Sequence, residues 1–371
     1  MHVFLLTVAL ATQAQQSDSA TFITRLGTDT IAVERFTFDG RVLDGVSVTR
    51  SPNVSVHRYR AVFGAGGVDS LTLAEGPAGR PARTVTTYRY SDDSVQVETR
   101  QDSSTRRQSS GVHGRPLPFA PDVLGPWEVA LQSALAAGTG DPQLSLFTGS
   151  ETIRYTVHRL GADSLHLAIE HGDFGPLVAR MDGAGRLQSL DLRATTDKFL
   201  AERVSGLDVD SMTAVFAARE LAGKGLGNLS PRDTTRATVG GARVQIDYGR
   251  PLRRGRVIFG TVVPWDTVWR TGANQATQLI TDKDLVVGGT VVPAGTYSLF
   301  TIPSTKGWML IINKQHGQWG TDYDAKQDLA RIPMRLRTLP TPIERFTIVT
   351  RDSNLVISWD QAEASVDMKA R

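Results

Sequence analysis

Hydrophobic and polar positions alternate in short runs over the first two hundred residues, which is the pattern of half-buried strands. Residues 30–38 place Ile31 and Val33 on one side, and Asp39-Gly40 follows as a turn signal before its hairpin partner, residues 41–48. The predicted architecture of this half is an antiparallel β domain. Similar runs occupy residues 54–63, 70–74, 83–90, 94–99, 151–159, 163–169, 177–181 and 186–192.

Two segments of this half have helical periodicity. Residues 122–137 carry apolar side chains near one helical face, with Asp122 as the expected N-cap, and residues 210–222 form a second segment. The polar stretch 101–114 is predicted to be a mobile loop. The order of strands, one helix and further strands resembles antiparallel half-barrels that curl around a helix and hold lipids or lipoprotein tails, a resemblance of topology alone.

Glycine and proline then interrupt the pattern. Gly223, Gly225 and Gly227 precede Ser230-Pro231, so we place a linker at 223–235 between a domain spanning 20–222 and a second spanning 236–371. The second domain is again all strand, apart from a short helix expected at 323–330. About eight short strands predict a jelly-roll-like β-sandwich. These runs occupy residues 244–248, 256–260, 278–281, 285–287, 296–302, 308–313, 346–350 and 355–359.

The first fourteen residues combine a short apolar run with Thr12-Gln13-Ala14, which is typical of a secretory signal peptide, although a buried strand or helix would also fit. No other apolar run approaches the ~18 residues that span a bilayer, so we expect no transmembrane segment. The chain has no cysteine, which excludes disulfides and thiolate chemistry. We therefore expect a periplasmic or secreted protein.

Charge is distributed unevenly along the chain. The net charge is +3, and from Leu229 to the end there are 19 lysines and arginines against 13 acidic residues. A modest basic excess in the second half is compatible with an anionic ligand. It falls short of the clustered basic footprint of a nucleic-acid-binding protein, so no nucleic acid is expected as a partner. The oligomeric state is left open by the sequence.

Aromatic and glycine motifs of the second half follow one another in a distinctive order. They include the segments from Arg250-Pro251 to Gly260, from Val263-Pro264-Trp265 to Thr277, from Pro293-Ala294-Gly295 to Pro303, and from Trp308 to Gly320. These segments strongly resemble an uncharacterised bacterial family, domain of unknown function 2911, over about residues 237–360. The resemblance implies a fold class and an export context but no mechanism. Gln275 stands where that family usually has an acidic residue.

The polar and aromatic residues of these motifs are the candidate ligand-binding site. Trp269 and Arg270 could form a platform in which the indole stacks on a ring and the guanidinium forks to a carboxylate or phosphate. The alternative is that Trp269 fills the core and Arg270 pairs internally, and the run of arginines near Arg256 could be a solvated face. The full candidate set is Trp269, Arg270, Asn274, Thr277, Tyr297, Trp319 and Arg256.

Enzyme chemistry has less support in the sequence. His316, with Asp322 or Asp324 nearby, could serve as a base, but no serine stands in a nucleophile motif. We expect neither a metal nor a cofactor, because the grouping of His158, His166, Glu170 and His171 lacks the spacing of a complete ligand set. The leading hypothesis is an exported, non-catalytic binding module for a small anionic, sugar-like or glycan ligand. The alternatives are a periplasmic hydrolase or isomerase and a cell-envelope interaction protein.

Overall fold

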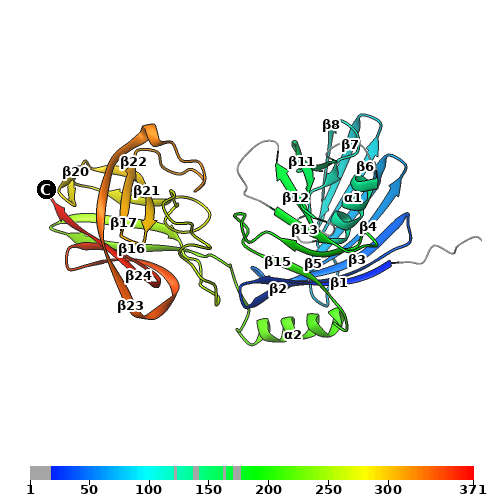
Figure 1. Ribbon diagram of the computed structural model, residues 1–371, viewed down its shortest axis with the longest axis horizontal. Coiled ribbons are helices and arrows are strands. Elements are labelled where there is room, and N and C mark those ends of the chain that lie inside the picture. The colour runs from blue at the N-terminus through cyan, green and yellow to red at the C-terminus, as the bar shows by residue number, and fades with distance from the viewer. Residues whose placement is uncertain (1–17, 121–122, 137–141, 162–163, 170–176) are drawn as a thin grey trace, which may run out of the picture.

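A computed structural model describes residues 18–371, except 121–122, 137–141, 162–163 and 170–176. The chain forms two mostly antiparallel β-sheets, each built from one side of the glycine-rich segment 223–231 (Figure 1). Strands of the first sheet lie between Asp18 and Val204, and strands of the second lie between Arg232 and Ala370. The expected signal peptide, residues 1–14, lies outside the described residues.

The first sheet has fifteen strands in the order β8-β7-β6-β5-β4-β3-β2-β1-β15-β14-β13-β12-β11-β10-β9. All neighbours are antiparallel except β9 and β10, which are parallel. The strands are β1 (Asp18–Leu26), β2 (Asp29–Phe38), β3 (Val42–Thr49), β4 (Ser55–Gly64), β5 (Gly67–Pro77), β6 (Thr84–Ser91), β7 (Ser94–Gln101), β8 (Ser104–Gly111), β9 (Leu117–Pro118), β10 (Gln143–Phe147), β11 (Thr152–Arg159), β12 (Ser164–Ile169), β13 (Leu177–Met181), β14 (Leu187–Asp191) and β15 (Leu200–Val204).

The predicted hairpins of this half are confirmed, but the prediction of a mobile loop at 101–114 is wrong. Strand β8 lies within that stretch and pairs with β7 from Ser94↔Gly111 to Gln101↔Ser104. Its side chains are polar and mostly exposed. The pairing is therefore made by backbone hydrogen bonds at the edge of the sheet. Such a strand buries no apolar residues, so the alternation of apolar and polar positions could not predict it.

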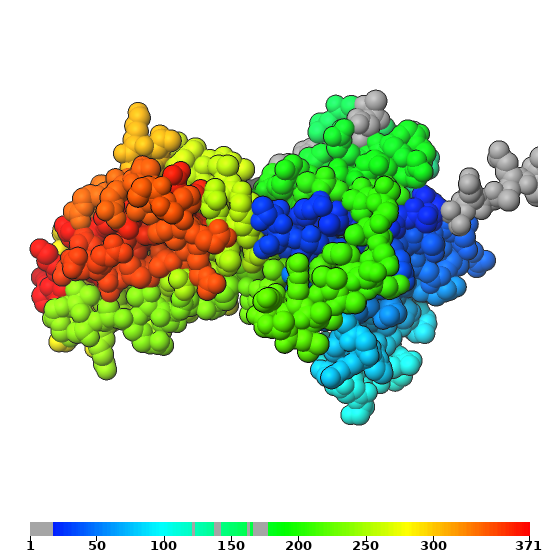
Figure 2. Space-filling view, turned by 90° about the horizontal axis from the view of Figure 1, so that it is seen from below, coloured from blue at the N-terminus to red at the C-terminus, as the bar shows by residue number. Residues whose placement is uncertain are grey.

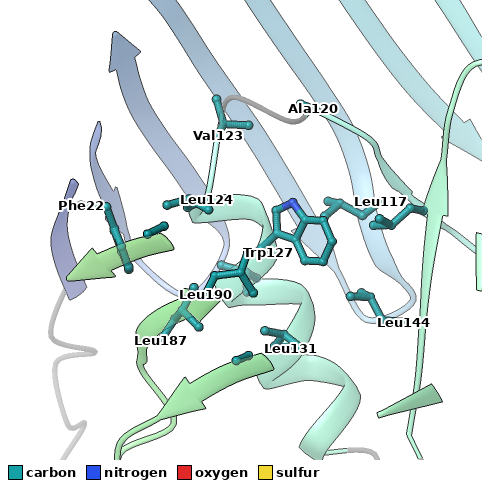
Figure 3. Packing of buried hydrophobic residues seen from close by; sticks show 14 of the residues in the cluster. Phe22, Leu117, Ala120, Val123, Leu124, Trp127, Leu131, Leu144, Leu187 and Leu190 are labelled. Atoms are coloured by element: carbon teal, nitrogen blue, oxygen red, sulfur yellow. The ribbon is translucent and has the colours of Figure 1, made fainter. Parts of the chain in front are cut away.

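Helix α1 (Gly125–Ala136) packs on one face of the first sheet, where Trp127 lies among leucines from several strands (Figure 3). The expected cap, Asp122, lies outside the described residues. The first amides of the helix are bonded instead by Glu34 of β2, which accepts from the amides of Leu124 at 2.7 Å and Gly125 at 2.9 Å. A carboxylate at a helix N-terminus satisfies orphan donors and complements the helix dipole.

Helix α2 (Val209–Leu221) covers the opposite face of the same sheet. Its predicted position is confirmed, and Asp208 caps it by accepting from the amides of Asp210 and Ser211. Phe216 anchors the helix in a small core with Val33 and other valines of β2, β3 and β4. The first sheet therefore buries apolar side chains on both faces, one under each helix.

The second sheet has nine strands in the order β16-β17-β18-β21-β22-β23-β24-β19-β20, all antiparallel. Tyr248 of β17 packs edge-on against Phe346 of β23 at 5.8 Å between ring centres, so separated strands share one core. The strands are β16 (Arg232–Val239), β17 (Ala242–Gly249), β18 (Thr277–Thr281), β19 (Leu285–Val287), β20 (Thr290–Val292), β21 (Gly295–Ser304), β22 (Gly307–Asn313), β23 (Asp328–Arg351) and β24 (Asn354–Ala370).

Two predictions for this half are wrong. Residues 256–260 form turns and an isolated bridge rather than a strand, because Arg254 and Gly255 adopt left-handed backbone and turn the chain. The helix expected at 323–330 is reduced to one 3₁₀ turn, Ala325–Gln327, since residues from Asp328 onward join the long strand β23. Strand β16 starts at Arg232, inside the segment interpreted as linker.

Candidate anion-binding site

Two turns, one from each half, meet next to the segment that connects the sheets. The amide of Thr28, in the turn between β1 and β2, donates to the carbonyl of Arg254 at 2.9 Å. Gly27 and Gly255 flank this contact with φ of +61° and +69°. A Cβ at Gly27 would lie 2.1 Å from the Arg254 oxygen, so only glycine allows this approach. Figure 2 shows the contact between the blue and yellow-green segments.

Ion pairs neutralise two of the arginines at this junction. Arg254, whose side chain is 5% exposed, pairs across the junction with Asp29. Arg253 pairs with Asp360 at 3.0 Å. These two guanidinium groups therefore act as structural contacts, one between the halves and one within the second half.

Arg256 has no such partner among the described residues. Its guanidinium donates to the backbone carbonyls of Arg253 at 3.0 Å and Leu252 at 2.6 Å. Burial and the neighbouring charge of Arg254 lower the pKa of Arg256 to about 10, although Glu344 and Asp29 act in the opposite direction. The side chain is held in place by neutral oxygens, which leaves its charge only partly balanced.

Arg270 is a second cation without an ion pair in the described part of the chain. Its Nη1 atom donates to the carbonyl of Asn274 at 3.5 Å, the limit of a hydrogen bond. Burial lowers its pKa. Its alkyl chain lies on the backbone of Gly320, where a Cβ would be 2.2 Å from the Arg270 Cδ atom. Gly320 thus allows the loop after β22 to hold this arginine.

Lys198 brings a third cation from the first half. It follows β14 in a loop, has a left-handed φ of 63°, and is half-buried. Its pKa is lowered by burial first, and then by repulsion from Arg270 and Arg256. The charges of both arginines therefore act on Lys198 across the junction, and no described carboxylate forms an ion pair with any of the three cations. We call Lys198, Arg256 and Arg270 the junction cluster.

Two of the other candidate residues lie beside Arg270. Asn274, exposed and with a left-handed φ of 64°, accepts through its carbonyl from the amide of Gly320 at 3.0 Å. Trp319 is 49% exposed and forms a bridge with Gln275. An indole with this exposure next to cations offers a flat apolar surface to the organic part of a ligand.

The remaining candidates have internal contacts. Trp269 stacks on Trp359 with 6.0 Å between ring centres and packs against the core of the second half. This agrees with the alternative interpretation of the sequence, in which Trp269 serves packing. The hydroxyl of Thr277 is buried and donates to the Thr271 carbonyl at 2.7 Å. The hydroxyl of Tyr297 donates to the Pro293 carbonyl at 2.9 Å. The described polar contacts of Thr277 and Tyr297 therefore hold local turns and loops together.

The residues considered for catalysis or metal binding are dispersed. His316 is exposed, and no described hydrogen bond or ion pair joins it to Asp322 or Asp324, whose carboxylate caps the 3₁₀ turn. Within the described ranges no three histidine, aspartate or glutamate side chains are grouped as metal ligands. Of the earlier histidine grouping, Glu170 and His171 lie outside the described residues.

A larger cavity lies on the face of the first sheet that carries α2. Its volume is about 1020 Å³, and its lining includes Arg35, Arg58 and Arg60. Arg35 pairs with Asp210 and Arg60 with Asp44, both at 2.7 Å. Arg203, the fourth arginine of the lining, pairs with Glu128 at 2.5 Å. Because three of its four arginines are already paired, this cavity presents less uncompensated charge than the junction cluster does.

Comparison with known proteins identifies the second half. Residues 230–368 match the family described as protein of unknown function DUF2911, which confirms the resemblance seen in the sequence. No curated protein matches the chain. Among the helices that the structure describes, none is long and apolar enough to cross a membrane.

Proposed function

We propose that this protein is a non-catalytic binding protein for a small anionic ligand, which is held at the junction cluster. The supporting observation is that Lys198 lies close enough to Arg256 and Arg270 for their charges to act on it, while none of the three forms an ion pair in the described chain. Three cations of like charge repel one another, and a bound anion removes that repulsion. Guanidinium groups also match carboxylate and phosphate oxygens geometrically.

The two halves have separate parts in this proposal. The second half supplies Arg256, Arg270 and the exposed ring of Trp319, and the first half supplies Lys198. A ring-bearing anion would place its charged group on the cations and its ring on the indole of Trp319. The finer description of the second half as a jelly-roll-like sandwich is part of the same proposal, since many such folds carry ligands at strand-connecting loops.

Titration calorimetry of the full chain with inorganic phosphate and with citrate tests the proposal, and glucose serves as a neutral probe. We expect both anions to bind and the affinity to fall as sodium chloride is raised. Arg270→Gln and Lys198→Gln should each weaken binding about tenfold, since a charge-assisted hydrogen bond contributes roughly 1.5–3 kcal/mol. Arg243→Gln, which removes an arginine that is 84% exposed and paired with Asp282, is the matched control.

Two results would contradict the proposal. One is the absence of heat with either anion, and the other is equal affinity for wild type and both junction variants. Glucose binding that is insensitive to salt would favour a sugar ligand recognised without the cations.

Export is proposed on the sequence alone. The apolar run ending at Ala11 and the following Thr12-Gln13-Ala14 predict cleavage after Ala14, so that the mature chain begins at Gln15. Intact mass measurement of protein recovered from the medium or periplasm of an expressing bacterium tests this, and a full-length mass in the cytoplasmic fraction would contradict it.

A further inference from the structure

A second, separate cavity lies on the face of the first sheet that carries α1. Its volume is about 140 Å³. Two neighbouring cross-strand rows of side chains run through this part of the sheet. One row pairs Glu34 of β2 with Ser47 of β3 and Ser47 with His57 of β4, and the other pairs Thr24 of β1 with Ala32 of β2 and Ala32 with Thr49 of β3. The first row and Thr49 are buried in the described structure.

Ser47 is the unusual member of this group. Its residue is 1% exposed, its side chain lines the cavity, and its Oγ atom has no hydrogen-bond partner in the described chain. A buried hydroxyl without a partner costs roughly 1–3 kcal/mol of stability, and alanine would avoid that cost. His57 does not relieve it, because its ring is 3.4 Å from the Thr49 hydroxyl.

The carboxylate of Glu34 shapes what this cavity accepts. Three donors already bond it, namely the amides of Leu124 and Gly125 and the hydroxyl of Tyr59. An ionised carboxylate offers about four acceptor positions, so one position on Glu34, the cross-strand neighbour of Ser47, has no donor in the described chain. Ionised Glu34 would repel an anion here, whereas a donor group between the two oxygens would satisfy both. The other walls are largely apolar: Ile31, Leu124, Phe199 and Leu229.

We propose that this cavity binds a short apolar molecule with a hydrogen-bond-donating head, an amine or an alcohol, with the head between Ser47 and Glu34. A volume near 140 Å³ corresponds to roughly five water molecules at about 30 Å³ each, which is room for a chain of about five heavy atoms. The site shares no lining residue with the junction cluster, and its ligand has the opposite charge preference. It therefore stands whether or not the anion proposal holds.

Saturation-transfer NMR on the full chain at pH 8, above the pKa of about 7 of Glu34, tests this with n-butylamine, n-butanol and sodium butyrate. The amine, the alcohol or both should bind, and butyrate should not. Ser47→Ala should weaken binding about five- to tenfold, the effect of one lost hydrogen bond. Ser47→Val fills the head-group position and should abolish binding. Ser133→Ala, which removes a hydroxyl of α1 that does not line the cavity, is the matched control.

Binding of the amine alone assigns an ammonium ligand, and binding of both probes assigns any small donor. The proposal is overturned if neither probe binds the wild-type protein, or if butyrate binds as well as the amine. It is also overturned if Ser47→Ala, folded as judged by its circular dichroism spectrum, binds as tightly as wild type. Since Ser47 has no partner to lose, we expect that variant to be at least as stable as wild type.

Discussion

The amide of Thr28 donates to the carbonyl of Arg254 at 2.9 Å, which joins the first half of the chain to the second outside the connecting segment. Gly27 and Gly255 make this bond possible, because both have left-handed backbone and neither has a Cβ atom that would separate the turns. The contact lies two residues before Arg256, whose charge acts on Lys198. The geometry of the junction cluster thus depends on backbone features of two turns.

Gly27→Ala should therefore open the junction. The new Cβ would clash with the Arg254 carbonyl, so the hydrogen bond and the adjacent ion pair would be lost, at a cost of about 2 kcal/mol beyond the backbone strain itself. Limited proteolysis of the segment 223–231 should become faster, and the denaturant midpoint should fall. Gly79→Ala is the control, since its φ of +69° imposes similar strain with no atom within 4 Å. Equal behaviour of the two variants would show that the contact contributes nothing.

The ion pair between Asp29 and Arg254 should give a large coupling energy in a double-mutant cycle. Asp29→Ala leaves a guanidinium that is 5% exposed without its partner, which should cost about 2–4 kcal/mol. In an Arg254→Met background the same change should cost less than about 1 kcal/mol, because the Asp29 side chain is 36% exposed. Urea unfolding of the four proteins measures the coupling. Additive effects would mean that the two charges do not interact.

Stability should depend on pH through Glu34. Burial is the largest cause that raises the pKa of this carboxyl from 4.5 to about 7, and the hydrogen bond from Tyr59 is the largest opposing cause. Between pH 4.5 and pH 7 the unfolded chain releases a proton that the folded chain retains. The contribution of Glu34 to the free energy of unfolding is therefore complete below pH 4.5 and declines as pH rises through 7. The resulting loss in the free energy of unfolding should reach about 3 kcal/mol.

Urea unfolding between pH 4.5 and 8 measures this slope. Glu34→Gln should be less stable, because a glutamine side chain has a single acceptor oxygen and cannot accept from Leu124 and Gly125 as the two Glu34 oxygens do, but its profile should lack the decline. Glu151→Gln removes an exposed carboxyl and should leave the slope unchanged. A Glu34→Gln profile as steep as that of wild type would assign the pH dependence to another group.

Alternation of apolar residues predicted most of the hairpins, because strands such as β17 bury every second side chain. It failed at β8, whose polar residues pair through the backbone, and at 256–260, where hydrophobic residues follow a left-handed turn. Arg256 and Arg270 could be proposed as an anion site from residue type alone. Lys198 could not, since it stands alone in a loop and reaches the cluster only when the two halves meet.

Replacing the two tryptophans proposed for the binding site should have different effects, one on stability and the other on binding. Trp269 packs against Trp359, Trp308 and Phe346, so Trp269→Ala should cost about 3–5 kcal/mol of stability. Trp319 is 49% exposed, and Trp319→Ala should cost less than about 1 kcal/mol while weakening the binding of a ring-bearing anion. Urea unfolding and calorimetry with phthalate, an aromatic dicarboxylate, measure the two effects. Phthalate affinity that is unchanged in Trp319→Ala would remove the indole from the site and leave the cations as its sole contacts.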